Sequence, residues 1–156
     1  MHALIKSAGT VALFSFLANN HAAEPAAAKR TVPRFDHVLI VIMENEDQER
    51  IIGNPAAPYI NSLARAGANF TDAHAVTHPS QPNYLALFSG STQGVTDNSC
   101  PLTFTGKANL ASQLVAAGLT FTGFSEDLPA PGYTGCAAGE YRRKHNPWVN
   151  FDNVDS

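Results

Sequence analysis

The segment that most constrains the fold is His37–Met43, with the sequence HVLIVIM. It is a continuous apolar run of strand length and is rich in β-branched residues. A strand with one face in solvent would alternate apolar and polar residues. This run does not, so it is typical of a strand buried on both faces in a parallel sheet flanked by helices. It therefore predicts a central strand.

Helical patterns and a further strand-like run follow this segment. The expected helices are Tyr59–Ala66 after Pro58, a helix from about Pro82 to Phe88 that ends at Gly90, and Asn109–Ala117 before Gly118. Leu119–Phe124 then has a strand-like pattern. Strands that alternate with helices predict an α/β fold with a mainly parallel sheet flanked by helices.

The first residues have the order of a secretory signal peptide. Residues 1–23 carry one charge, Lys6, then the apolar run Ala8–Ala18, and end in small residues. The apolar run is about 11 residues long, and a membrane-spanning helix needs about 20, so no stable membrane anchor is expected. Residues 24–34 are interpreted as a leader, and residues 35–156 as the domain. The protein is expected to be periplasmic or secreted.

Export affects the interpretation of the two cysteines. In an oxidising compartment Cys100 and Cys136 are expected to form a disulfide. Two unpaired buried thiols are the alternative. A metal or nucleophilic role has no support, because there is no Cys-x-x-Cys spacing and no histidine beside either cysteine.

Composition excludes several classes of protein. The 156 residues suffice for one domain, and 44% hydrophobic residues exclude a disordered chain. The sequence has 10 Lys and Arg against 13 Asp and Glu, a net charge of -3. Without a basic excess, nucleic acid is not expected as a partner.

Glu44 and Asn45 follow the predicted central strand directly. In open parallel sheets the reactive groups collect beyond the carboxyl ends of the strands. A carboxylate at this place must emerge at the sheet edge or bind a cation, because burying it unpaired would cost several kcal/mol. Glu44 is thus either a metal ligand or the start of the solvated acidic loop that runs to Glu49.

Ser80 lies just before a predicted helix that has Pro82 in its first turn. A hydroxyl at this place is close to unpaired backbone N–H groups and to the positive end of the helix dipole, which suits a phosphate or an alkoxide nucleophile. The alternative is that Ser80 only caps the helix. His78 is either a base or an ordinary loop histidine.

Asn98 closes the segment Gly94-Val95-Thr96-Asp97-Asn98. Its side-chain amide could donate a hydrogen bond to a phosphoryl oxygen without adding charge. The alternative is that Asp97 and Asn98 only form an ordinary turn, in which both residue types are common. The spacing alone leaves both interpretations open.

Taken together, four segments resemble the phosphoesterase family, which groups bacterial acid phosphatases with phospholipases C in the alkaline phosphatase superfamily. They are His37–Asn45 (HVLIVIMEN), Ala57–Leu63 (APYINSL), Thr77–Tyr84 (THPSQPNY) and Phe88–Thr92 (FSGST). The resemblance runs from about Phe35 to Val154. It implies an alkaline-phosphatase-like fold and the hydrolysis of small phosphate esters.

The resemblance also implies a role for each candidate residue. Glu44, Asn45 and Ser80 would hold a divalent metal ion, and Ser80 would be the nucleophile that is transiently phosphorylated. Asn98 would stabilise the phosphoryl oxygens, while His78 and Asn83 would orient the site. The segment Tyr141–Trp148 (YRRKHNPW) would bring Arg142, Arg143, Lys144 and His145 to an anionic substrate.

One departure from the family concerns length. Family members are longer, and their remaining metal ligands lie in the C-terminal half, whereas this sequence ends at Ser156. The chain is therefore expected to be a truncated N-terminal part. An acid-phosphatase-like enzyme is the leading hypothesis, and a phospholipase C is the alternative within the class. An inactive fragment or binding module is the alternative outside it.

Overall fold

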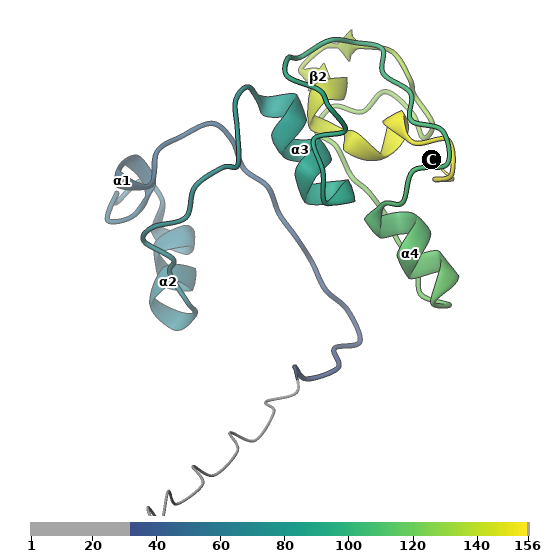
Figure 1. The fold of residues 1–156 in the computed structure, drawn as a ribbon. Helices are drawn as coiled ribbons and strands as arrows, with labels where there is room; N and C mark the ends of the chain where they lie inside the picture. The colour runs from purple at the N-terminus through teal and green to yellow at the C-terminus, as the bar shows by residue number, and fades with distance from the viewer. Residues whose placement is uncertain (1–31, 156) are drawn as a thin grey trace, which may run out of the picture. The chain divides into compact units, whose positions relative to one another are not determined.

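In the computed structural model, residues 32–155 are described. The chain divides into two compact units, residues 1–45 and residues 46–156, and each is described by itself (Figure 1). The predicted signal peptide, residues 1–23, lies outside the described residues. So does most of the predicted leader.

In the first unit, the apolar run after His37 has no regular secondary structure. From Val38 to Met43 the six side chains are between 50% and 84% exposed. A strand requires hydrogen bonds to a neighbouring strand, and the structure gives this run none. The strand predicted here therefore stays a prediction.

The second unit begins with two helices, α1 (Gln48–Ile51) and α2 (Pro58–Ala66). Asn61 on α2 fixes the loop between them: its Nδ2 donates to three backbone carbonyls, and its Oδ1 accepts from Gly53 N at 2.6 Å. Pro58 occupies the first position of α2, as predicted, because a missing N–H costs nothing there.

The helix α3 comprises Ser80–Ser89. It ends where Gly90 adopts a left-handed conformation with φ of 69°, and the Gly90 N–H donates to the carbonyl of Ala86 at 2.8 Å. Glycine meets no steric penalty at this φ. The prediction of a helix that has Pro82 in its first turn and ends at Gly90 is confirmed.

The helix α4 comprises Leu110–Ala116 and begins with a capping box. Ser112 N donates to Asn109 Oδ1 at 2.9 Å, and Asn109 N donates to Ser112 Oγ at 3.1 Å. These bonds satisfy backbone N–H groups that the helix leaves unpaired. The run after α4, Leu119–Phe124, forms no strand.

Short elements complete this unit. They are β1 (Ala137–Ala138) and β2 (Tyr141–Arg142), which pair antiparallel, and the 3₁₀ turns η1 (Arg143–His145) and η2 (Pro147–Asn150). An isolated parallel bridge joins Phe104 to Phe151. No parallel sheet forms among residues 32–155, so the predicted α/β fold remains a prediction.

Aromatic rings form the core of the second unit. Phe88 on α3 is 5% exposed, and its ring centroid lies 5.5 Å from that of Phe121, 5.5 Å from that of Phe151 and 6.5 Å from that of Trp148. The core also includes Leu85 and Ala111, with Val95, Leu102, Phe104 and Val154 packed against it. This core supports α3, so it positions the residues at the start of that helix.

Within the part of the chain that the structure describes, no helix has the length and apolar character that crossing a membrane would require.

Candidate functional site

Ser80 is the first residue of α3. Pro79 occupies the capping position and has no side-chain group that could cap the helix. Ser80 therefore lies one position inside the helix and is not its N-cap, which was the alternative interpretation of this serine. Its half-buried side chain lies at the end of α3 where the first backbone N–H groups have no partner within the helix.

Asn83 holds the loop that leads into Ser80. Its Oδ1 accepts from Thr77 N at 3.0 Å, and its Nδ2 donates to the carbonyls of Thr77 at 2.6 Å and Pro79 at 3.1 Å. Both N–H donors of the amide are thus engaged by backbone oxygens. This arrangement suits an orienting role, and a direct contact of Asn83 with substrate stays a prediction.

Gln81 connects α3 to the loop that contains Asn98. The Gln81 N–H donates to Asn98 Oδ1 at 3.0 Å, and Gln81 Nε2 donates to the carbonyl of Ser99 at 2.9 Å. A backbone N–H can only donate, so the atom of Asn98 that faces it is the acceptor oxygen. Asn98 Nδ2 makes no hydrogen bond to the residues that the structure describes. The predicted donor amide therefore lies at the N-terminus of α3, against the residue that follows Ser80.

A tight turn shapes the Asn98 loop. Gly94 has φ of 77°, a conformation that L-residues rarely adopt. Ser99 N donates to Asp97 Oδ1 at 2.9 Å. Hydrogen bonds from the Ser99 side chain and then from its backbone lower the pKa of Asp97, and burial opposes them only weakly. The exposed Asp97 is thus ionised at neutral pH and fixes the turn beside Asn98.

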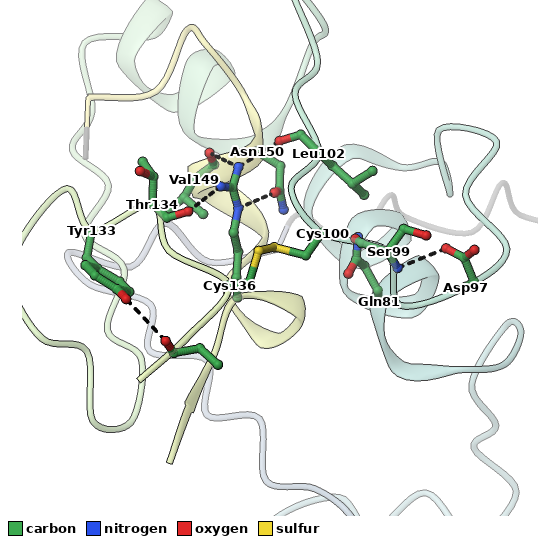
Figure 2. The surroundings of a disulfide bond; sticks show 12 residues. Gln81, Asp97, Ser99, Cys100, Leu102, Tyr133, Thr134, Cys136, Val149 and Asn150 are labelled. Carbon is green, nitrogen blue, oxygen red and sulfur yellow. Dashed lines mark hydrogen bonds between the residues drawn. A yellow bond between two sulfur atoms is a disulfide. The ribbon is translucent and has the colours of Figure 1, made fainter. Parts of the chain in front are cut away.

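The predicted disulfide is present. Cys100 and Cys136 are joined, with Cα atoms 5.9 Å apart and a sequence separation of 36 residues. Figure 2 shows the bond between two groups of side chains, with Gln81, Ser99 and Asp97 on the Cys100 side. The bond therefore anchors the chain one residue after Ser99.

On the other side of the disulfide, Arg143 joins two loops and η2. It is 6% exposed, and its guanidinium donates to Asn150 Oδ1 at 2.9 Å, to the Leu102 carbonyl at 2.7 Å and to the Val149 carbonyl at 3.2 Å. A further bond goes to the Thr134 carbonyl (Figure 2). Burial lowers the pKa of Arg143.

This arrangement bears on the role of Arg143. Arg143 donates hydrogen bonds to Leu102, Thr134, Val149 and Asn150 of the folded chain, which favours a structural role, and its contact with an anionic substrate stays a prediction. Arg142 is exposed, and its Nη1 donates to the carbonyls of Gly139 and Tyr141. Its contact with substrate stays a prediction.

The two candidate histidines differ in their surroundings. His145, on η1, is half-buried, and its ring centroid lies 5.3 Å from that of Tyr84. Tyr84 is four residues after Ser80 on α3, so the two residues lie on the same face of the helix. His78 is exposed in the loop before α3. The structure thus brings Asn83, Asn98 and His145 to the first half of α3.

Glu44 and Asn45 belong to the other unit, where both are exposed. Their place relative to Ser80 is therefore a matter of prediction. Among the described residues no group of three or more His, Cys, Asp or Glu side chains could hold a metal ion. The predicted donors are a carboxylate, an amide oxygen and a hydroxyl. These are hard oxygen ligands, which suit a hard divalent cation.

Two residues of this region were not identified from the sequence. Gln81 sits between Ser80 and Pro82, and nothing in its spacing distinguishes it from an exposed helix residue, although it is 2% exposed. Tyr84 is part of the quoted motif, yet only the fold reveals its contact with His145.

Comparison with known proteins gives the family. The model of the phosphoesterase family matches residues 54–155. The chain belongs to this family, which confirms the resemblance seen in the motifs. No solved structure gives a significant match.

Three similar proteins are named phosphatases. A phosphatidylinositol-3-phosphatase of Mycobacterium tuberculosis is 58% identical over 127 residues, which are 81% of this chain and 42% of that protein. A probable acid phosphatase of Kluyveromyces lactis and an acid phosphatase of Aspergillus fumigatus are each 32% identical over 127 residues. These cover 77% of this chain, and 30% and 28% of the two relatives. The chain thus spans less than half of the length of these relatives.

Proposed function

We propose that the chain carries the nucleophile end of an exported, metal-dependent phosphoesterase that forms a phosphoserine at Ser80. The observation that carries this proposal is the arrangement at the start of α3. Ser80 is the first helical residue, and the Asn98 amide is anchored to the next backbone N–H. Membership of the phosphoesterase family supports the same conclusion.

The chemistry follows from these positions. The Ser80 Oγ attacks the phosphorus atom, the bond between phosphorus and the ester oxygen breaks, and the alcohol leaves with a proton. Water then cleaves the phosphoserine, which releases phosphate and restores the hydroxyl. The dipole of the ten-residue α3 and a donor on Asn98 Nδ2 would stabilise negative charge on the phosphoryl oxygens.

Glu44, Asn45 and Ser80 are the proposed ligands of the divalent metal. When bound, such an ion would supply positive charge that favours the alkoxide form of the Ser80 hydroxyl. A divalent ion takes about four to eight ligands, so residues beyond these three would complete the site.

A phosphate monoester is the proposed substrate. The three relatives named above are phosphatases, and the one at 58% identity is named for a phosphoinositide that carries a monoester on a lipid headgroup. This favours a monoesterase over a phospholipase C. The disulfide supports export, because such bonds persist in oxidising compartments.

The test is Ser80→Ala in the full-length protein, with Ser125→Ala as the matched control, since Ser125 is not among the residues proposed to act in the site. With p-nitrophenyl phosphate, kcat is expected to fall by at least about 1,000-fold in Ser80→Ala and to stay unchanged in the control. Acid quench and mass spectrometry should detect phosphoserine at Ser80 in the wild type. A chelator should abolish turnover, and added divalent metal should restore it.

Wild-type turnover in Ser80→Ala would overturn the phosphoserine mechanism. Two substrate comparisons then define the specificity. Faster hydrolysis of bis(p-nitrophenyl) phosphate than of p-nitrophenyl phosphate would reverse the proposed monoester preference. Release of phosphate from vesicles that contain phosphatidylinositol 3-phosphate would extend the substrate class to lipids.

A further inference from the structure

Gln81 makes two hydrogen bonds to adjacent residues of a loop that lies 17 and 18 positions further along the chain. Its backbone N–H reaches Asn98 Oδ1, and its side-chain Nε2 reaches the carbonyl of Ser99. The side chain is 2% exposed, so the amide is held in a dry environment where such bonds are costly to lose. Gln81 thus binds the loop through both its main chain and its side chain.

These two bonds determine where Asn98 can point. The side-chain amide of Asn98 is planar. Once its Oδ1 is held by the Gln81 N–H, the Nδ2 atom can move mainly by rotation of the amide about that hydrogen bond. The second bond holds the backbone of Ser99, the next residue, which limits that rotation. With the backbone bond alone, Asn98 would be the single hydrogen-bonded contact between Gln81 and the loop.

Further contacts hold the loop on both sides of the two Gln81 hydrogen bonds. Before them, Asp97 accepts from Ser99 N at 2.9 Å and closes a turn around Asn98. After them, Cys100 is joined to Cys136, as Figure 2 shows beside Gln81 and Ser99. The Gln81 side chain therefore adds a second contact between this anchored loop and the N-terminus of α3.

We propose that Gln81 is a positioning residue that holds the Asn98 amide at the start of α3, with Nδ2 directed toward the phosphoryl group on Ser80. This inference rests on the proposed function, in which Ser80 is the nucleophile. Gln81 itself would contact no substrate atom. Its effect passes through Asn98, so the two residues should act as one unit.

The experiment uses Gln81→Met in the full-length protein, because methionine keeps the length and volume but removes the donor to Ser99. Asn98→Asp keeps the acceptor for the Gln81 N–H and removes the Nδ2 donors. Asn98→Asp is expected to lower kcat for p-nitrophenyl phosphate by about 100- to 1,000-fold. Gln81→Met should lower kcat by about 10- to 100-fold through misplacement, with KM changed much less.

The double variant distinguishes positioning from a general loss of stability. If Gln81 acts only through Asn98, then Gln81→Met should cause little further loss of kcat when Asn98→Asp is already present. Additive losses in the double variant would overturn the proposal. Gln113→Met, the same change at an exposed position of α4, is the matched control and should leave kcat unchanged.

A second measurement does not depend on turnover. In isotope-labelled protein, the NMR resonances of the Asn98 side-chain amide should shift and broaden in Gln81→Met and stay in place in Gln113→Met. Unchanged Asn98 resonances in Gln81→Met would refute the positioning role even if Ser80 is the nucleophile. If Ser80→Ala retains activity but the resonances shift, the contact is real and the proposed function is the part that fails.

Discussion

Two apolar regions of this molecule behave in opposite ways. From Val38 to Met43, six consecutive apolar side chains are at least half exposed. In the second unit, Phe88 and Phe151 are 5% and 3% exposed and lie within an aromatic cluster with Phe121 and Trp148. The first region has the more strongly apolar local sequence, yet only the second forms a core in the structure.

The difference shows what an apolar side chain needs in order to be buried. The aromatic cluster draws its members from α3, from the segment after α4 and from η2, so each ring meets rings that come from distant parts of the chain. A run of neighbours in an extended segment cannot cover its own side chains, because successive residues point to opposite sides. Apolar sequence is therefore a requirement for a core, and contacts distant in sequence complete it.

The largest expected effect tests the packed region. Phe88→Ala should lower the free energy of unfolding by about 3–5 kcal/mol, since it removes a buried ring that contacts three others. Leu87→Ala, one residue away and 56% exposed, should change it by less than about 1 kcal/mol. Urea denaturation followed by circular dichroism measures both. Equal losses would mean that the cluster is not the core.

The second-largest loss of stability is expected when the buried guanidinium of Arg143 is removed. Arg143→Met should lower the free energy of unfolding by about 3 kcal/mol, because it leaves backbone carbonyls such as that of Leu102 without a donor. Arg142→Met removes the adjacent, exposed arginine and should cost well under half as much. If the two variants unfold at the same urea concentration, Arg143 does not join the loops in solution.

The smallest effect is expected in the exposed run. Ile42→Asn should change the free energy of unfolding of this chain by less than about 0.5 kcal/mol, because Ile42 is 50% exposed and no strand holds it. Leu85→Asn, the same kind of change at a 0% exposed position, is the control and should be strongly destabilising. A loss of several kcal/mol in Ile42→Asn would contradict the contrast and would favour the predicted buried strand.

Local signals predicted the helices of the second unit well. Pro58, Gly90 and Asn109 act within one turn of the residues that they start or stop, so their effects can be read from neighbouring sequence. A strand depends on a partner that may lie anywhere in the chain, and neither run predicted as a strand is paired among the described residues. That dependence explains why local sequence signals predict these helices more directly than they predict a sheet.

The candidate site divides in the same way. Pro82 predicted the first turn of α3, although the helix begins at Ser80, two residues earlier than expected, and export predicted the Cys100–Cys136 bond. The structural role of Arg143 was not predicted, because the family resemblance placed it with its neighbours in a substrate-binding segment. Only the fold shows that carbonyls from two loops and from η2 surround this one guanidinium.

The packing of Trp148 has a practical consequence. It is the only tryptophan in the sequence, and it lies against Phe88 and Phe121 in the second unit. Intrinsic fluorescence excited at the indole band therefore reports on this cluster alone. A cooperative change in emission would follow the melting of the second unit and would carry no signal from the exposed run of the first. Because indole emission depends on its surroundings, the same side chain offers a label-free optical probe of whether a variant has kept its core.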